Sequence, residues 1–245
     1  MKNSFSGTLS PRLQAVLNFI AGNSSQRKVL ADIGTDHAYL PIAAVQQGLC
    51  ADAVACDLHP GPLAIADKNI QEAGLSDKIK TRLGDGLSPL SPGEAHCIVI
   101  AGMGGMRILG ILLEGMAQAR AATQLILQPQ HDTVLLRKNL HQAGFEIHDE
   151  AMVREIVPGR EHFYVIIAAQ HTGSVIPWSE QEYLLGKHLL AKGGKDFAAF
   201  VNREKAKIEA YISQIRDHKA LEDANMRLDL LSAPNIINEV MKCQK

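Results

Sequence analysis

Short, mostly apolar segments alternate with amphipathic segments through residues 28–143, and this alternation constrains the fold more than any other feature. The apolar segments read as strands covered on both faces, because they lack the polar alternation of a strand exposed on one side. Five strands are predicted at 28–33, 52–57, 79–83, 96–101 and 124–128, and helices at 38–47, 61–73, 104–119 and 133–143. This order predicts an α/β fold with a parallel sheet and helical crossovers.

The end of the pattern distinguishes between two kinds of doubly wound sheet. Two further strand-like segments, 145–153 and 162–169, are joined by residues 154–161, which are too few for a helical crossover. These two strands must therefore pair antiparallel. A dinucleotide-binding sheet would continue with parallel units. Five parallel units that end in an antiparallel hairpin are instead the layout of Rossmann-like methyltransferases.

Beyond Pro177 the composition becomes that of amphipathic helices. Helical segments are predicted at 179–191 and 196–219, with a break at Gly193-Gly194, so we expect an antiparallel helical hairpin, followed by a helix at 221–231. Apolar residues recur every seven positions in the second segment, as in a coiled coil. They are Val201, Ile208 and Ile215, with partial support from Phe197 and Tyr211.

A helix is also expected before the first strand. Residues 9–21 open with Ser10 as an N-cap and Pro11 at the first helical position. With this helix included, we divide the chain into a sheet domain, 1–172, and a C-terminal helical domain, 173–245.

The composition excludes several classes of protein. No apolar segment approaches the roughly 20 residues that span a bilayer. The first residues lack the apolar core of a secretory signal, so we expect a cytoplasmic protein with no membrane partner. Scattered cysteines predict buried free thiols rather than a disulfide framework; they are Cys50, Cys56, Cys97 and Cys243. The ten histidines show no ligand spacing, so no metal is expected.

The first predicted strand ends in a turn suited to a ligand. Asp32 lies at the strand tip, placed to accept hydrogen bonds from an amino group, and Gly34 begins a turn whose backbone N–H groups can bind an anion. Nucleotide-binding turns usually carry glycines two and four positions after the first, and here those positions hold Asp36 and Ala38. A plain strand-to-helix turn is therefore an open alternative.

Acidic residues also follow the second and third predicted strands. Asp57 lies 25 residues beyond Asp32, near the spacing at which an acid binds ribose hydroxyls, and Leu58 shares its strand tip. The third strand leads into the turn Gly84–Gly86, where the Asp85 carboxylate suits an adenine amino group. Each acid alone could be a solvated turn residue. Three acids on adjacent strand tips instead predict one crevice at the carboxyl edge of the sheet.

Glycines are concentrated after the fourth predicted strand, in the segment AGMGG at residues 101–105. This density costs conformational entropy, so something must require bare backbone there. One reason is a flat ligand close to the backbone of Ala101, Gly102, Met103 and Gly104. The other is a tight turn before the next helix.

Polar residues at the strand-to-helix junctions could line the mouth of the crevice; they are His37, Tyr39, His131 and Asp132. His131 and Asp132 are more simply interpreted as the N-cap of the next helix.

Segments 31–41 (ADIGTDHAYLP) and 98–105 (IVIAGMGG), together with the terminal helical hairpin, resemble the bacterial tRNA (adenine-22) N1-methyltransferase family. The resemblance covers nearly the whole chain. It implies a Rossmann-like methyltransferase fold, S-adenosyl-L-methionine as cofactor, and a tRNA substrate methylated at N1 of a D-arm adenine. It also implies that the C-terminal helices help to hold the RNA.

The resemblance further assigns cofactor-lining positions to Asp32, Gly34, Asp57, Asp85 and Gly102. Adenine N1 carries a lone pair at neutral pH, so we expect positioning rather than a strong base to supply the rate. Asp36 and His37 are candidates for catalytic assistance.

A net charge of −1 means that contacts to RNA phosphates must come from local patches. Candidates are Arg12, Arg27 and Lys28 near the first helix, and Lys195, Arg203, Lys205, Lys207, Arg216 and Lys219 on the hairpin. Acidic residues lie among them, so a solvated helix face is an equal alternative. A methyltransferase of another substrate, or a non-catalytic cofactor-binding module, also stays open. We expect a monomer, because an intramolecular hairpin is the economical use of the heptad pattern.

Overall fold

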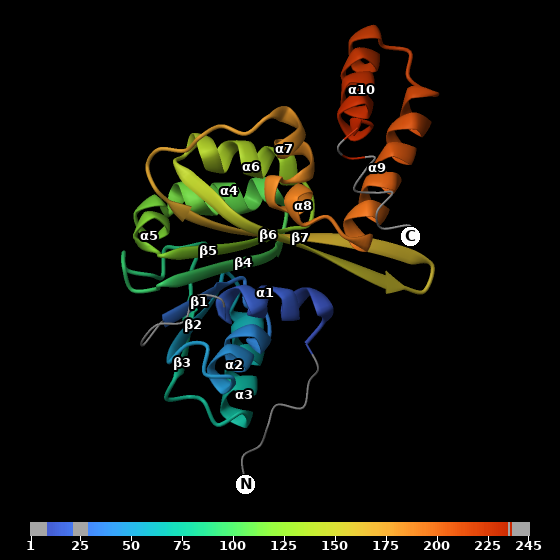
Figure 1. Cartoon of the computed structure of the whole chain (residues 1–245). Helices are drawn as coiled ribbons and strands as arrows, with labels where there is room; N and C mark the ends of the chain where they lie inside the picture. Colours follow the sequence, from blue (N-terminus) through green and yellow to red (C-terminus); the bar gives the residue numbers. More distant parts are fainter. Residues whose placement is uncertain (1–8, 22–28, 235, 237–245) are drawn as a thin grey trace. The chain divides into compact units, whose positions relative to one another are not determined.

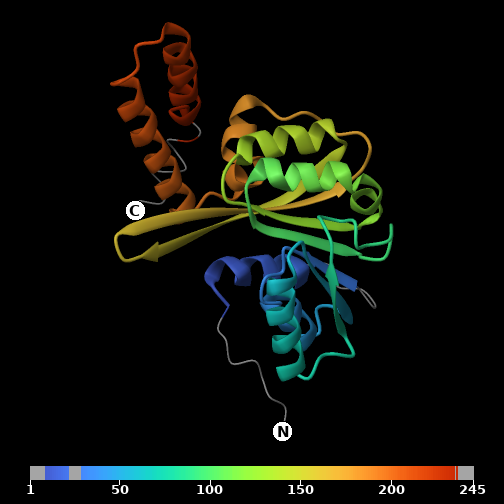
Figure 2. The same cartoon turned by 180° about the vertical axis from the view of Figure 1, so that it is seen from behind.

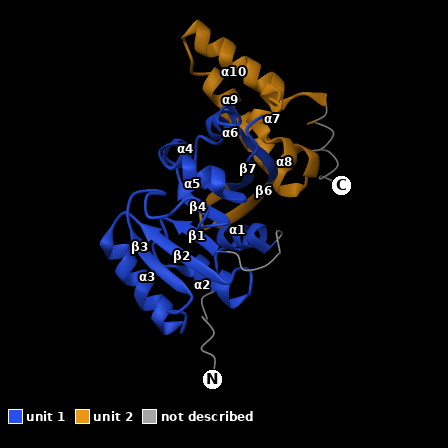
Figure 3. Cartoon of the chain, turned by 90° about the vertical axis from the view of Figure 1, so that its left-hand side faces the viewer, with its two compact units in different colours: residues 1–149, 164–175 blue, residues 150–163, 176–245 orange. Residues whose placement is uncertain are grey.

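The computed structural model describes residues 9–21, 29–234 and 236. The chain divides into two compact units (Figure 3). Unit 1 comprises residues 1–149 and 164–175, and unit 2 comprises residues 150–163 and 176–245. The terminal β-hairpin is thus shared, because its distal residues group with unit 2 and its remaining residues with unit 1.

Seven strands form one mixed sheet in the order β3-β2-β1-β4-β5-β7-β6 (Figure 1). They are β1 (Val29–Ile33), β2 (Asp52–Asp57), β3 (Ile79–Leu83), β4 (Cys97–Met103), β5 (Gln124–Pro129), β6 (Phe145–Val157) and β7 (Arg160–His171). Strands β1 to β5 pair in parallel, and β7 is antiparallel to β5. The predicted α/β sheet with a terminal hairpin is confirmed. The strand order reverses between β1 and β4, which is where such sheets bind ligands.

Helices cover both faces of the sheet in unit 1, with α1 to α3 on one face and α4 to α6 on the other (Figures 1 and 2). They are α1 (Pro11–Ala21), α2 (Tyr39–Gln46), α3 (Pro60–Glu72), α4 (Gly105–Glu114), α5 (Met116–Ala121) and α6 (Thr133–Gln142). As predicted, Ser10 caps α1, since its hydroxyl accepts a hydrogen bond from the N–H of Leu13 at 3.3 Å.

The helix predicted at 104–119 is two helices, because the chain breaks at Gly115. A Cβ at this position would lie only 2.4 Å from the Cβ of Leu87. The close approach of the Leu87 loop therefore requires a residue without a side chain here. The single helix expected from the amphipathic pattern is wrong.

The sheet core is apolar on both faces. Leu30, Ile98, Ile100 and Leu125 are at most 1% exposed, which explains the strands without polar alternation. Within the described residues, no helix is both long enough and apolar enough to traverse a membrane.

Unit 2 contains α7 (Glu180–Leu185), α8 (Lys187–Lys192), α9 (Lys195–Ile212) and α10 (His218–Leu231). The segment predicted as one helix at 179–191 breaks at Gly186, where φ is 91°. The helix predicted at 196–219 ends at Ile212, so Ile215, which we expected to continue the heptad pattern, lies outside the helix. The helices that pack side by side are α9 and α10 (Figure 1). The helical hairpin is therefore formed by these two helices and not by the segments 179–191 and 196–219, as predicted.

Candidate functional site

Backbone hydrogen bonds tie the first three strand ends together at the carboxyl edge of the sheet. The N–H groups of Gly34 and Thr35 donate to the carbonyl of Cys56, at 2.8 and 3.0 Å, and so join the loop after β1 to the end of β2. The N–H of Gly84 donates to the carbonyl of Asp57 at 3.0 Å and joins the loop after β3 to β2. The structure therefore brings the three predicted acidic tips into one neighbourhood.

Asp32 is a buried carboxylate at the end of β1, with 6% of its surface exposed. Its Oδ2 accepts a hydrogen bond from the Thr35 hydroxyl at 2.7 Å. Burial raises the pKa of Asp32 to about 6; the Thr35 hydrogen bond opposes that rise, and the nearby charge of Asp57 adds to it. A cationic partner would favour the ionised form, so the surroundings of Asp32 suit an ammonium group.

The loop after β1 has a left-handed backbone at the residues where a nucleotide-binding turn usually carries glycine. The φ angles are 75° at Gly34, 48° at Asp36 and 56° at Ala38. Residues with side chains pay a steric cost in this region. The backbone of a glycine-rich turn is thus kept here without two of its glycines.

The loop after β4 lies against the loop after β1. A Cβ on Gly34 would be 2.3 Å from Cε of Met103, so a side chain at Gly34 would displace Met103. Gly102 has a φ of 81°, and the pairing of β4 with β5 shifts register between Ala101 and Met103. The bare backbone predicted around Gly102 therefore coincides with a β-bulge, a feature often found beside active sites.

The side chains of Asp57 and Asp85 already have partners. Asp57 Oδ1 accepts a hydrogen bond from the N–H of His59 at 2.9 Å. Asp85 pairs with Arg107 of α4 at 2.8 Å, with both side chains about half exposed. Leu58 is 46% exposed and follows Asp57 at the tip of β2, so it offers an apolar surface next to that acid.

The candidate catalytic residues Asp36 and His37 lie together. Asp36 Oδ2 is 3.2 Å from His37 Nε2, and the His37 ring stacks on Tyr39 with centroids 5.1 Å apart. The buried Nδ1 of His37 has no hydrogen-bond partner within the described part of the chain. His37 therefore offers one polar atom that the fold does not satisfy.

His131 and Asp132 only partly match the N-cap interpretation. Asp132 is at the N-cap position of α6, with φ 59°, but its side chain makes no capping hydrogen bond. Its Oδ2 lies 2.7 Å from His131 Nδ1 instead. The His131 ring contacts Gly104, since a Cβ there would be 2.5 Å from Cε1 of the ring. The pair therefore borders the glycine-rich loop.

Several of the basic residues predicted as phosphate contacts have partners within the fold. Arg12 donates to Gln128 at 2.7 Å. In unit 2, Arg203 lies over the Phe163 ring, 4.3 Å from its centroid, and Lys207 pairs with Glu204 at 2.7 Å. Lys195, Arg216 and Lys219 are exposed, Lys205 is half-buried, and Arg27 and Lys28 lie outside the described residues.

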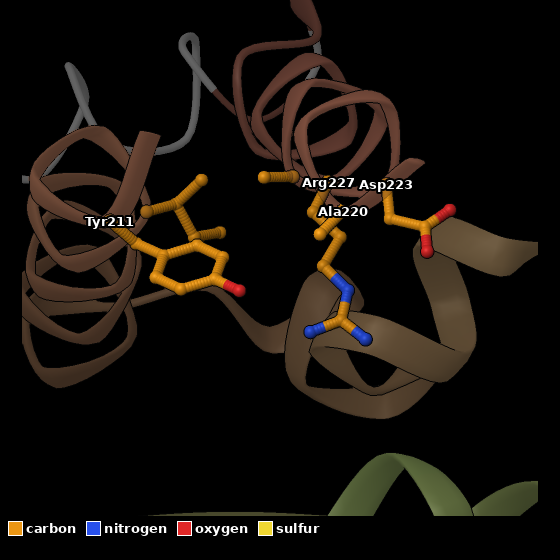
Figure 4. A pocket seen from close by; sticks show the side chains of 6 residues that line it. Tyr211, Ala220, Asp223 and Arg227 are labelled. Carbon is orange, nitrogen blue, oxygen red and sulfur yellow. The ribbon is translucent and has the colours of Figure 1, made fainter. Parts of the chain in front are cut away.

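A cavity of about 200 Å³ lies between α9 and α10 (Figure 4). The Tyr211 side chain projects from α9 and the Arg227 side chain from α10 into the space between the helices. The lining is completed by Ile208, Ala220, Asp223 and Ala224.

Three of the cysteines are buried free thiols, as predicted; they are Cys50, Cys56 and Cys97. Cys243 lies outside the described residues. Burial raises the pKa of Cys50 and of Cys56 to about 12, so neither is a nucleophile at neutral pH. Among the residues that the structure describes, no three His, Cys, Asp or Glu side chains are grouped to hold a metal ion.

Sequence reasoning missed three residues of this edge: Thr35, Arg107 and Gln128. No local sequence pattern predicts that Thr35 bonds Asp32 or that Arg107 pairs with Asp85. Gln128 had a usable signal, because it is a polar residue at the end of an apolar strand, and it is fully buried.

Comparison with known proteins gives the family. The model of the family described as tRNA (adenine(22)-N(1))-methyltransferase matches residues 30–233. The chain belongs to this family. A tRNA (adenine(22)-N(1))-methyltransferase of Bacillus subtilis is 40% identical over 147 residues, and the match spans 60% of this chain and 60% of that protein.

Two solved structures resemble nearly the whole chain and contain the cofactor or its product. A Streptococcus pneumoniae protein assigned to tRNA m1A22 methylation, in complex with S-adenosyl-L-methionine, is 30% identical with a TM-score of 0.82. The alignment covers 94% of this chain and 100% of that one. A Mycoplasma capricolum family member with S-adenosyl-homocysteine is 26% identical with a TM-score of 0.79, covering 95% and 99%.

Proposed function

We propose that this protein transfers the methyl group of S-adenosyl-L-methionine to N1 of adenine 22 in tRNA. The family match supports the reaction, and the relative bound to S-adenosyl-L-methionine supports the cofactor. The observation that carries the proposal is the clustering of Asp32, Asp57 and Asp85 at the carboxyl edge of the sheet, with Asp32 on β1, one of the two strands at the strand-order reversal.

The donor set at this edge suits the cofactor. Burial raises the pKa of Asp32, so a nearby cation would stabilise its ionised form, and the amino group of the cofactor is such a cation. Asp57 would accept from the ribose hydroxyls and Asp85 from the adenine amino group, with exposed Leu58 against the base. The glycines at Gly34, Gly102 and Gly104 let Met103, Arg12 and His131 pack against the bare backbone of these two loops, which would form the wall facing the cofactor.

S-adenosyl-L-methionine supplies an electrophilic methyl group on a sulfonium. The chain has to hold the adenine so that N1 faces that methyl group, and such positioning contributes much of the rate. Adenine N1 needs no deprotonation, so neither Asp36 nor His37 has to act as a strong base. A supporting role for the Asp36–His37 pair is to accept a hydrogen bond from the positively charged product base.

The target base must leave its pairing and stacking before its N1 edge can be reached. RNA phosphates would bind to exposed basic residues such as Lys195, Arg216 and Lys219 on the C-terminal helices. We further propose a monomer that acts in the cytoplasm without a metal ion. Light scattering at assay concentration tests the monomeric state, and retention of activity in excess EDTA tests the independence from metal.

The decisive assay uses labelled S-adenosyl-L-methionine and unmodified tRNA, followed by digestion and identification of the labelled nucleoside. We expect 1-methyladenosine, and we expect it to be lost when the tRNA carries guanine at position 22. Cofactor binding without label would favour a non-catalytic module. Label at another nucleoside, in protein or in a small molecule would assign a different acceptor.

A further inference from the structure

The bulge in β4 removes the N–H of Gly102 from the sheet ladder. Ala101 pairs with Gln128 and Met103 pairs with Pro129, so Gly102 is the extra residue between two ladder positions. A buried or half-buried N–H without a partner costs free energy, so another acceptor is needed. The loop that borders the methyl-transfer site therefore depends on a side chain for one of its hydrogen bonds.

Gln128 supplies that acceptor. Its Oε1 lies 3.1 Å from the N–H of Gly102, and its Nε2 donates to the carbonyl of Pro129 at 2.8 Å. Gln128 is 0% exposed, so its amide group makes these hydrogen bonds inside the unit rather than with solvent. The strand β5 thus fixes the bulge of its neighbour β4 through a buried amide.

Arg12 of α1 holds the same oxygen. Its Nη1 donates to Gln128 Oε1 at 2.7 Å, which uses the second lone pair of that oxygen. Its guanidinium also lies over the Tyr164 ring, 5.6 Å from the centroid, and Nη1 would be 3.3 Å from a Cβ on Gly102. A charged donor makes a stronger hydrogen bond than a neutral one and fixes the amide orientation.

We propose that Arg12 is a positioning residue that acts through Gln128 to hold the bulge at Gly102 in the geometry needed for methyl transfer. The inference rests on the proposed function for its catalytic part. It gives Arg12 a different role from the phosphate contact expected from the sequence. Three residues from α1, β4 and β5, separated by up to 116 positions, would then act as one unit.

The two roles predict different kinetics for Arg12→Ala. A positioning role predicts that the single-turnover rate at saturating tRNA and cofactor falls about 10-fold to 100-fold, with tRNA affinity changed less than roughly twofold. A phosphate contact predicts weaker tRNA binding, a shallower salt dependence, an unchanged rate at saturation, and rescue by Arg12→Lys. The second pattern would overturn the proposal.

A double-mutant cycle tests whether Arg12 acts through Gln128. Gln128→Leu should lower the single-turnover rate by about as much as Arg12→Ala, and the double variant should lower it no further. Independent, multiplying losses would contradict the link. Gln14→Ala is the matched control, because Gln14 is an exposed residue on the same helix whose side chain bonds Asn18. Its rate should equal that of the unmodified protein.

A readout without substrate separates this inference from the proposed function. Amide hydrogen exchange at Gly102 in the ligand-free protein, followed by NMR, should be about 10-fold faster in Arg12→Ala and unchanged in Gln14→Ala. An unchanged exchange rate at Gly102 in Arg12→Ala would contradict the inference even if the unmodified protein methylates tRNA. Faster exchange in Arg12→Ala, in a protein that does not methylate tRNA, would support the link from Arg12 through Gln128 to Gly102 and refute only the methylation proposal.

Discussion

The Asp85 carboxylate accepts a hydrogen bond from the Arg107 guanidinium at 2.8 Å, and this pair joins the loop after β3 to α4. Asp85 is also the acid that we assign to the adenine of the cofactor. The cofactor must therefore share this carboxylate with Arg107 or displace it.

Removing Arg107 should strengthen cofactor binding slightly. An exposed ion pair contributes little, so we expect Arg107→Gln to tighten S-adenosyl-L-methionine binding by no more than roughly fivefold. Calorimetric titration measures this. Arg120→Gln, which removes an exposed charge from α5, is the control and should bind as the unmodified protein does. Weaker binding in Arg107→Gln would mean that Arg107 itself contacts the ligand.

Cofactor affinity should depend on pH through Asp32. Its pKa is about 6 in the folded protein, so the carboxylate that binds an ammonium group forms only as the pH rises through 6. We therefore expect affinity to rise with pH up to about 6.5 and then level off. Asp32→Asn should bind weakly with no such rise, and an unchanged pH profile in this variant would assign the titration to another group.

The same group predicts the direction of a stability change. Because burial raises the pKa of Asp32 above its unfolded value, the native state holds more protons between pH 3.8 and 6. The contribution of Asp32 to the free energy of unfolding should therefore fall by about 3 kcal/mol as the pH rises across this window. Urea unfolding of the protein and of Asp32→Asn across this window isolates the contribution, which must be absent from the variant.

Gly34→Ala should damage both stability and cofactor binding. Its φ of 75° costs a residue with a side chain about 1–2 kcal/mol, and the new methyl group would press on Met103. Gly48→Ala is the matched control, since φ is 71° there and nothing lies near the added Cβ. Gly34→Ala should lose more stability than Gly48→Ala in thermal unfolding, because only its methyl group displaces Met103, and only Gly34→Ala should lose affinity. Equal affinities would remove Gly34 from the site.

Two substitutions at Asp36 separate its backbone from its carboxylate. Asp36→Gly keeps the left-handed turn without strain and should be at least as stable as the unmodified protein, whereas Asp36→Ala should be about 1 kcal/mol less stable. If the carboxylate assists methyl transfer, both variants should slow the single-turnover rate alike, and His37→Ala should slow it too. Unchanged rates in all three would remove the pair from the mechanism.

The fold and the acidic strand tips were predictable because they depend on local pattern. Parallel strands covered on both faces are apolar throughout, and the residue that ends each strand, such as Asp32 or Asp57, must lie at the same edge of the sheet. The short connection before β7 likewise leaves antiparallel pairing as the remaining choice. These inferences need no knowledge of distant contacts.

The rest depends on contacts between distant residues. Gly115 breaks a helix because Leu87 packs against it, and no periodicity within the helix shows that. Arg12 looks like a surface cation in the sequence, yet its partner Gln128 lies 116 residues away. Such pairings are set by tertiary structure rather than by residue type.

Titration of S-adenosyl-L-methionine into the unmodified protein and into Asp57→Ala, followed by calorimetry, tests the central claim most directly. The claim predicts one site per chain in the unmodified protein and a loss of affinity of at least about tenfold when the ribose-binding carboxylate is removed. No binding heat in the unmodified protein, or equal affinity in the two proteins, would contradict it.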